Sequence, residues 1–315
     1  MTVDVVGNTA ADISVEVDHF PPGTKAEFGA ASLVVAHQAA RLGIGGNAGR
    51  TAAVLGELGT RVRLHTRLGT DVWGDWLEGE LTRTGVELIG KRSGESATNC
   101  VATDRSGRRL SFFHPGASHY GTPKPRPDTR FLVVAGCPFP DLGELAVWLP
   151  KFDEARIPVL TDVGPPLFER PDLAKLARLA GTDMYLTMNE AELSELTGCR
   201  DPSDGVRELR TTGFVRVIVK LGPRGALVST PENGASRRVP TAQLPMGCRS
   251  TVGAGDSFNA GFVHGLLCGL DPCHAAALGN RAAHRALVGF KLGDPSERVE
   301  TRSHLDEKHR GVKEI

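Results

Sequence analysis

A glycine-bearing turn late in the chain combines an anion site with an acid–base group. Residues 250–256 read STVGAGD, and the run that follows, SFNAGFVHGLLCGL, has apolar residues at helical spacing. A helix is therefore predicted to begin in this turn, where its first amides lack intrahelical partners and the helix dipole adds partial positive charge. Gly253 and Gly255 let the backbone approach a ligand, and Asp256 can accept a proton.

Two interpretations of this turn are open. Asp256 could be an ordinary N-capping aspartate that follows a glycine turn. Alternatively, Gly253, Ala254 and Gly255 shape an anion hole in which amides stabilise charge on transferred phosphoryl oxygens, while Asp256 deprotonates an acceptor hydroxyl. The other motifs of the chain favour the catalytic interpretation.

The elements that must position this turn alternate between strand and helix. The predicted strands are the apolar runs VDVVG, RVRLHTRLG, RFLVVAG, IPVLTDVG, DMYLTM and VRVIVKLG. Helical patterns lie between several of them, at 49–58, 75–84, 142–155, 167–180 and 190–197. This alternation predicts an α/β fold with a mainly parallel sheet covered on both faces, and ligands beyond the carboxyl ends of its strands.

Two segments interrupt the alternation, at about 12–35 and 96–114, and together they could form a small second sheet. In the second of them, two alternating strands are joined by residues 104–107 (DRSG). One domain is expected over 1–292. Residues 293–315 are polar and charged, and we interpret them as a mobile tail.

The TVGAGDSFNAGF run resembles the C-terminal signature of the ribokinase or PfkB family of carbohydrate kinases. The likeness extends from VDVVGNTAAD to about Phe290, through LGIGGNAGRTAAVLGELG and RLGTDVWGDWLEGELTRTGVEL. It implies a ribokinase-like, doubly wound sheet flanked by helices, with a small β-sheet lid. It also implies ATP- and Mg²⁺-dependent phosphorylation of a hydroxyl of a sugar or sugar derivative, with Asp256 as the base.

The resemblance also assigns roles to residues outside the turn. Substrate-binding positions match Asp12, Gly45, Gly46, Asn47 and Arg50; ATP-binding positions match Asn189, Lys220, Gly222, Gly225 and Asn280; and a magnesium-organising position matches Glu192. Taken alone, these features have simpler interpretations. Asp12 could be a turn aspartate, NEAE (189–192) an acidic helix start, and KLGPRG (220–225) a hairpin.

The chain departs from the family pattern at two positions. Ser250 stands where the family usually has an aspartate associated with a monovalent-cation site, so dependence on such a cation is in doubt. Arg50 stands where the family usually has an asparagine that touches the sugar. An inward guanidinium could pair with an anionic acceptor, such as a sugar acid or sugar phosphate, whereas an outward one would have no such role.

Composition limits the partners. Lys and Arg together number 37, as do Asp and Glu, so no net field attracts nucleic acid. No apolar run is long enough to span a membrane, and the start of the chain lacks a signal pattern, so a cytoplasmic location is expected. A small-molecule substrate is predicted, and a homodimer through the lid is consistent with the resemblance.

Three further patterns carry less weight. His264, Cys268, Cys273 and His274 could be zinc ligands, but buried core cysteines and surface histidines explain them more simply. Residues 85–92 nearly spell a phosphate loop, but Arg92 replaces the required Ser or Thr. No GxGxxG follows Gly7 as a dinucleotide site requires.

The acceptor itself is not predicted. A nucleoside kinase of the same family and a non-catalytic sugar-binding or nucleotide-binding relative remain alternatives. Asn99, Arg109 and His114 are candidate acceptor contacts because they lie on the predicted lid.

Overall fold

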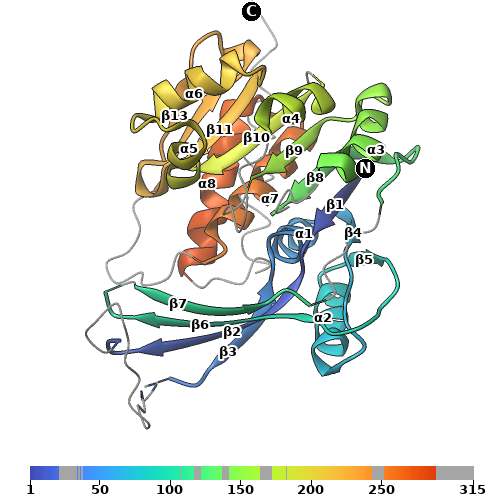
Figure 1. Ribbon diagram of the computed structural model, residues 1–315, viewed down its shortest axis with the longest axis vertical. Helices are drawn as coiled ribbons and strands as arrows, with labels where there is room; N and C mark the ends of the chain where they lie inside the picture. The colour runs from blue at the N-terminus through green and yellow to red at the C-terminus, as the bar shows by residue number, and fades with distance from the viewer. Residues whose placement is uncertain are drawn as a thin grey trace, which may run out of the picture.

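The structure is a computed structural model that describes residues 1–20, 34, 36, 38–106, 108–116, 122–136, 142–163, 172–181, 183–242 and 252–288. The predicted tail (293–315) and Ser250 lie outside the described residues. The described strands form two sheets, one of nine strands and one of four, which lie apart from each other in Figure 1.

The large sheet is mainly parallel, as predicted. Its strand order is β13-β12-β11-β10-β9-β8-β1-β4-β5. The strands are β1 (Thr2–Gly7), β4 (Arg61–His65), β5 (Val86–Ile89), β8 (Thr129–Ala135), β9 (Val159–Asp162), β10 (Met184–Asn189), β11 (Arg216–Lys220), β12 (Ala226–Ser229) and β13 (Arg237–Val239). Neighbours from β5 to β11 are parallel, and β12 and β13 continue the sheet antiparallel. The carboxyl ends of the parallel strands therefore share one edge.

Helices cover both faces of the large sheet, which explains the unbroken apolar strands. One face packs against α1 (Asn47–Glu57), α7 (Ala254–Leu267) and α8 (Pro272–Val288). The other packs against α3 (Leu142–Glu154), α4 (Leu173–Ala180), α5 (Glu190–Thr197) and α6 (Pro202–Thr211). On β8, Val133 lies in the first core cluster and its neighbours Leu132 and Val134 lie in the second, because successive side chains point to opposite faces.

Two predicted helices begin three or more residues away from the expected residue. The helix expected from residue 75 is α2 (Val72–Arg83), because the Asp71 carboxylate accepts a hydrogen bond from the Gly74 amide and caps the helix earlier. The helix expected from residue 167 begins at Leu173 as α4, with Asp172 as its N-cap; residues 164–171 lie outside the described ranges.

The small sheet, called the lid below, has the order β3-β2-β6-β7. Its strands are β2 (Ala10–Val17), β3 (Arg41–Gly45), β6 (Ala97–Asp104) and β7 (Arg109–His114). The predicted lid ranges contain most of β2 and all of β6 and β7 but not β3, whose glycines at 43 and 45 weaken the strand signal. β2 and β6 are parallel, and the other pairs are antiparallel.

A buried ion network ties the central strands together. The Arg63 guanidinium on β4 lies 2.9 Å from the Asp4 carboxylate on β1, and His65 lies 2.8 Å from the same carboxylate. Burial raises the pKa of Asp4, but hydrogen bonds from His65, Thr129 and Arg63 outweigh burial and hold it below its ordinary value. These contacts compensate the cost of burying the Asp4 carboxylate at the centre of the sheet.

Replacing Arg63 with methionine is expected to lower the free energy of unfolding by about 3–5 kcal/mol, because Asp4 would be left buried without its counter-ion. Urea unfolding measures the change. Arg61→Met is the matched control, since Arg61 is exposed on the same strand and should change stability by less than about 0.5 kcal/mol. Equal stability of the two variants would contradict the assigned role of the network.

Candidate active site

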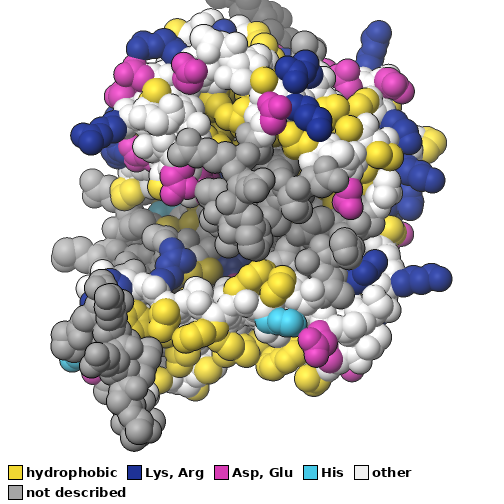
Figure 2. Space-filling model, viewed as in Figure 1, with side chains coloured by type: hydrophobic (Ala, Val, Ile, Leu, Met, Phe, Trp, Pro, Cys, Tyr) yellow, Lys and Arg dark blue, Asp and Glu magenta, His cyan; other side chains and the backbone are white. Residues whose placement is uncertain are grey.

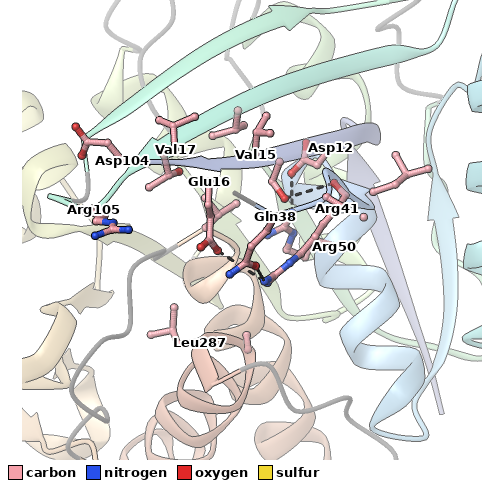
Figure 3. A pocket seen from close by; sticks show the side chains of 18 residues that line it. Asp12, Val15, Glu16, Val17, Gln38, Arg41, Arg50, Asp104, Arg105 and Leu287 are labelled. Atoms are coloured by element: carbon pink, nitrogen blue, oxygen red, sulfur yellow. Dashed lines mark hydrogen bonds and ion pairs between the residues drawn. The ribbon is translucent and has the colours of Figure 1, made fainter. Parts of the chain in front are cut away.

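A cavity of about 560 Å³ lies between the lid and the C-terminal end of α8 (Figure 3). Asp12 and Glu16 of β2, Arg50 of α1 and Leu287 of α8 are among the residues that line it. Figure 3 shows Asp12 and Arg50 meeting at one end, and Asp104 and Arg105 lying farther along the lid. The cavity thus lies between the lid and the main body, which is where the resemblance to the family places the acceptor.

Asp12 of the lid and Arg50 of α1 form a largely buried ion pair. The Arg50 Nη2 atom donates to Asp12 Oδ2 at 2.6 Å, and Arg50 Nε donates to the Ile44 carbonyl at 3.2 Å. Asn99 Nδ2 donates to Asp12 Oδ1 at 3.3 Å, while Asn99 Oδ1 is buried without a partner among the described residues. Arg50 therefore faces inward, and Asn99 presents a free acceptor beside Asp12.

The glycines of the GG motif are required by this packing. A Cβ at Gly45 would lie 2.0 Å from Asp12 Oδ1, so any side chain there would displace the carboxylate. Gly46 has φ 72° and stands at the N-cap of α1. Asn47, the first residue of α1, lies against Gly136 beside the carboxyl end of β8, and the cavity lining does not include it.

The turn before α7 has the geometry that the sequence predicts. Gly253 is the N-cap with φ 79°, a left-handed conformation that favours glycine, and α7 begins at Ala254. The first backbone hydrogen bond of the helix runs from the Ser257 amide to the Gly253 carbonyl at 3.0 Å. The amides of Ala254, Gly255 and Asp256 precede it and are the natural anion-binding groups of the helix.

Asp256 lies in this first turn with its side chain 16% exposed. Burial raises the pKa of Asp256 to about 7, against the opposing charges of Arg50 and Lys220. Burial also raises the pKa of Asp12, partly offset by Arg50. A carboxylate whose pKa lies near neutrality is suited to accept a proton and release it again.

Lys220, at the carboxyl end of β11, reaches the same turn. Its Nζ atom lies 3.3 Å from Asp162 Oδ1 and would lie 3.4 Å from a Cβ placed on Gly255. Burial lowers the pKa of Lys220, but the charges of Asp162, Glu192 and Asp256 outweigh burial and raise it. The ammonium group therefore stays charged beside the anion site.

Asp162, Asn259 and Thr187 are site residues that the sequence patterns did not single out. Asn259 Nδ2 donates to Asp162 Oδ2 at 2.7 Å, and Thr187 Oγ1 donates to Asn259 Oδ1 at 3.2 Å. Asp162 pairs with Lys220, and Asn259 of α7 and Thr187 of β10 hold Asp162 in place through this chain of hydrogen bonds. A signal was present for Asp162, because it ends a parallel strand at the ligand-binding edge, and for Asn259, a polar residue on a buried helix face.

Asn189 and Glu192 form a capping box at the start of α5. The Glu192 amide donates to Asn189 Oδ1 at 2.9 Å, and the Asn189 amide donates to Glu192 Oε2 at 2.7 Å. Burial raises the pKa of Glu192, opposed by Lys220. The pair thus caps α5, in agreement with the simpler interpretation of NEAE as an acidic helix start. The second carboxylate oxygen of Glu192 takes no part in the capping box.

The remaining predicted ATP residues lie around the β11–β12 hairpin. Gly222 and Gly225 both have positive φ, and a Cβ at Gly225 would lie 2.0 Å from the Val239 carbonyl. Asn280 Nδ2 donates to the carbonyls of Val239 and Pro240, both at 3.1 Å. The structure therefore places Asn280 as an anchor for the end of β13.

The other candidates are not assembled into this site. His114 pairs at the surface with Glu95 at 3.1 Å, and Arg109 is exposed opposite Thr103, which lines the cavity. Among the described residues, no three or more His, Cys, Asp or Glu side chains are grouped to hold a metal ion. His264 instead contacts the Thr60 hydroxyl at 2.8 Å.

Across the residues that the structure describes, no helix has the length and apolar character needed to cross a membrane.

Comparison with known proteins identifies relatives along most of the chain. The family model described as pfkB family carbohydrate kinase matches residues 2–293. The uncharacterized sugar kinase YegV of Escherichia coli K12 is 27% identical over 286 residues, which cover 85% of this chain and 84% of the relative. A nucleoside kinase of Methanothermobacter thermautotrophicus is 27% identical over 278 residues, covering 84% and 82%.

Solved structures share the fold. The adenosine kinase of Sinorhizobium meliloti superposes with a TM-score of 0.78 at 20% identity, covering 95% of this chain and 98% of that one. Arabidopsis thaliana ribokinase complexed with ribose and ATP has a TM-score of 0.70 at 23% identity, covering 90% and 91%. The ribokinase-like fold with its lid is thus confirmed, and the match of the family model over nearly the whole chain means that the protein belongs to the pfkB family of carbohydrate kinases.

Proposed function

We propose that the protein transfers the γ-phosphoryl group of ATP to a hydroxyl of a sugar or sugar derivative bound in the cavity under the lid. The observation that carries this proposal is Asp256, a buried carboxylate in the first turn of α7 whose pKa lies at about 7. A base and an anion-binding helix terminus in one turn are the two parts that phosphoryl transfer needs. Family membership supports the reaction class.

In the proposed reaction, Asp256 accepts the proton of the acceptor hydroxyl. The hydroxyl oxygen forms a bond to the γ-phosphorus, and the bond between that phosphorus and the bridging oxygen breaks to release ADP. The amides of Ala254, Gly255 and Asp256 stabilise the negative charge on the transferred group. Lys220, held by Asp162, adds a fixed positive charge beside this turn.

The ATP and magnesium residues fit this arrangement. Asn189, Lys220, Gly222 and Gly225 lie at or near the carboxyl ends of β10 and β11 or on the adjoining hairpin, and Asn280 on α8 binds the carbonyls at the end of β13. Mg²⁺ usually keeps several waters and takes few protein ligands, so the Glu192 oxygen outside the capping box suits an outer-shell role. Bound Mg²⁺ would neutralise charge on the phosphates. The doubt about dependence on a monovalent cation rests on Ser250, which lies outside the described residues.

Arg50 supports a more specific hypothesis, in which the acceptor carries a negative charge. Its guanidinium faces the cavity, and its donors that are paired among the described residues are Nε and Nη2. The remaining Nη1 protons could bind a carboxylate or phosphate of the acceptor. A nucleoside acceptor is the second candidate, supported by the nucleoside kinase relative.

We also propose a homodimer, because the outer face of the lid exposes apolar side chains. Strand register aligns Ile13, Cys100 and Phe112 in one row across β2, β6 and β7, and none of the three lines the cavity. Phe112 is 65% exposed and Leu110 of the adjacent row is 40% exposed. Figure 2 shows hydrophobic side chains gathered over the lid. A second copy of the same face would bury this surface by isologous packing.

Asp256→Asn is expected to lower kcat by a factor of roughly 10²–10⁴ while ATP still binds, because the amide cannot accept the proton. A coupled ADP-release assay measures kcat, and an ATP-induced shift in melting temperature measures binding. Asp183→Asn, an exposed aspartate away from the cavity, should retain wild-type activity. Near-normal turnover by Asp256→Asn would refute the assignment of the base.

The same variant should not be destabilised. Because burial raises the pKa of Asp256 to about 7, its ionisation costs stability as pH rises through that value. The melting temperature of Asp256→Asn at pH 8 is therefore expected to equal or exceed that of the wild type. A lower value would mean that lost activity reflects unfolding.

A panel of neutral sugars, sugar acids, sugar phosphates and nucleosides, tested with ATP and Mg²⁺, identifies the acceptor. If the acceptor is anionic, Arg50→Asn should raise its KM roughly tenfold or more, since a charge-assisted hydrogen bond is lost. An unchanged KM for every substrate that is turned over would exclude the anionic hypothesis. Turnover of nucleosides alone would favour the second candidate.

The dimer is tested by sedimentation velocity. Phe112→Glu should convert a dimer into a monomer, because a charge in the centre of an apolar interface is not compensated. Val147→Glu is the matched control, since Val147 is 61% exposed on α3, outside the lid. A wild-type monomer, or a Phe112→Glu dimer, would contradict the proposal.

A further inference from the structure

Arg50 links the lid to the base in the main body. Its Nη2 atom lies 2.6 Å from Asp12 Oδ2, and its Nε atom lies 4.0 Å from Asp256 Oδ2. Arg50 lines the cavity, whereas Asp256 is not among the lining residues. The guanidinium therefore lies at the cavity wall and within 4.0 Å of the Asp256 carboxylate.

The local backbone leaves room for this guanidinium. A Cβ on Gly253 would lie 1.9 Å from Arg50 Nη1, so a side chain at the N-cap of α7 would exclude the arginine from its position. The hydrogen bond from Nε to the Ile44 carbonyl fixes the planar group from the other side. Arg50 is thus held by α1, β3 and the α7 turn together.

The charges around Asp256 show what Arg50 contributes. The charged groups with the largest effect on Asp256 are Arg50 from α1, Asp162 from β9, Lys220 from β11 and Asp12 from β2. Lys220 already lies against Asp162, so it is largely committed to that carboxylate. Arg50 is then the cation shared by Asp12 and Asp256. Without it, the two carboxylates would repel each other in a buried site.

We propose that Arg50 is a positioning residue that holds Asp12 and Asp256 in a single ion-pair network and favours the ionised form of the base. The proposal rests on the proposed role of Asp256 as the base, but not on the charge of the acceptor. An asparagine at position 50 could donate hydrogen bonds, yet it would supply no charge. The chain with Arg50 therefore deprotonates its acceptor at a lower pH than the Arg50→Asn variant does.

The direct test is a carboxyl ¹³C NMR titration of the full chain labelled at aspartate, with the Asp256 signal assigned by its loss in Asp256→Asn. Removal of an opposite charge within about 4–6 Å should move the titration midpoint of Asp256 upward by roughly one to three pH units in Arg50→Asn. Arg50→Lys, which keeps the charge, should move it less. Arg61→Asn, an exposed arginine change, should leave it in place.

The pH profile of kcat provides the second readout, with the acceptor found in the panel above. Since Asp256 acts when ionised, the acid limb of the profile should move to higher pH in Arg50→Asn and be largely restored in Arg50→Lys. An unchanged NMR midpoint in Arg50→Asn would overturn the inference. A shifted midpoint without any kinase activity in the wild type would instead support the ion-pair role and refute the proposed function.

Discussion

Two buried carboxylates, one from the lid and one from α7, share the guanidinium of Arg50. Asp12 belongs to the lid and Asp256 to the first turn of α7, and neither could be buried as an ion without a counter-charge. This constraint explains the small residues around them. Gly45 leaves room for the Asp12 carboxylate and Gly253 leaves room for the guanidinium, so the glycines of both motifs serve one ion-pair network as well as ligand access.

The parallel strands of the large sheet bring the other residues of the site together. Because β9, β10 and β11 are parallel neighbours, Asp162, Asn189 and Lys220 arrive at the same edge from distant parts of the sequence. Asn259 on α7 connects this edge to the helix that carries Asp256. Asp162, which holds Lys220, and Asp256, the proposed base, are therefore fixed by one rigid assembly, which suits a reaction that depends on positioning.

Much of this arrangement could be predicted from the sequence, and the exceptions have physical causes. The alternating strands and helices, the α7 turn and the hairpin of β6 and β7 are local patterns, and the structure contains them all. β3 was not predicted because its glycines have low strand propensity. Its pairing with β2 depends on tertiary context, which a local sequence pattern does not contain. The inward orientation of Arg50 and the contact between Lys220 and Asp162 join residues 38 and 58 positions apart, and sequence spacing carries no information about such distances.

The most direct measurement is a crystal structure of the protein with a non-hydrolysable ATP analogue, Mg²⁺ and its acceptor. The proposed function predicts an acceptor hydroxyl oxygen within about 3.2 Å of the Asp256 carboxylate, with the γ-phosphoryl group at the amides of Ala254, Gly255 and Asp256. A complex in which the acceptor hydroxyl binds away from Asp256, or the γ-phosphoryl group away from the α7 turn, would contradict the assignment of Asp256 as the base.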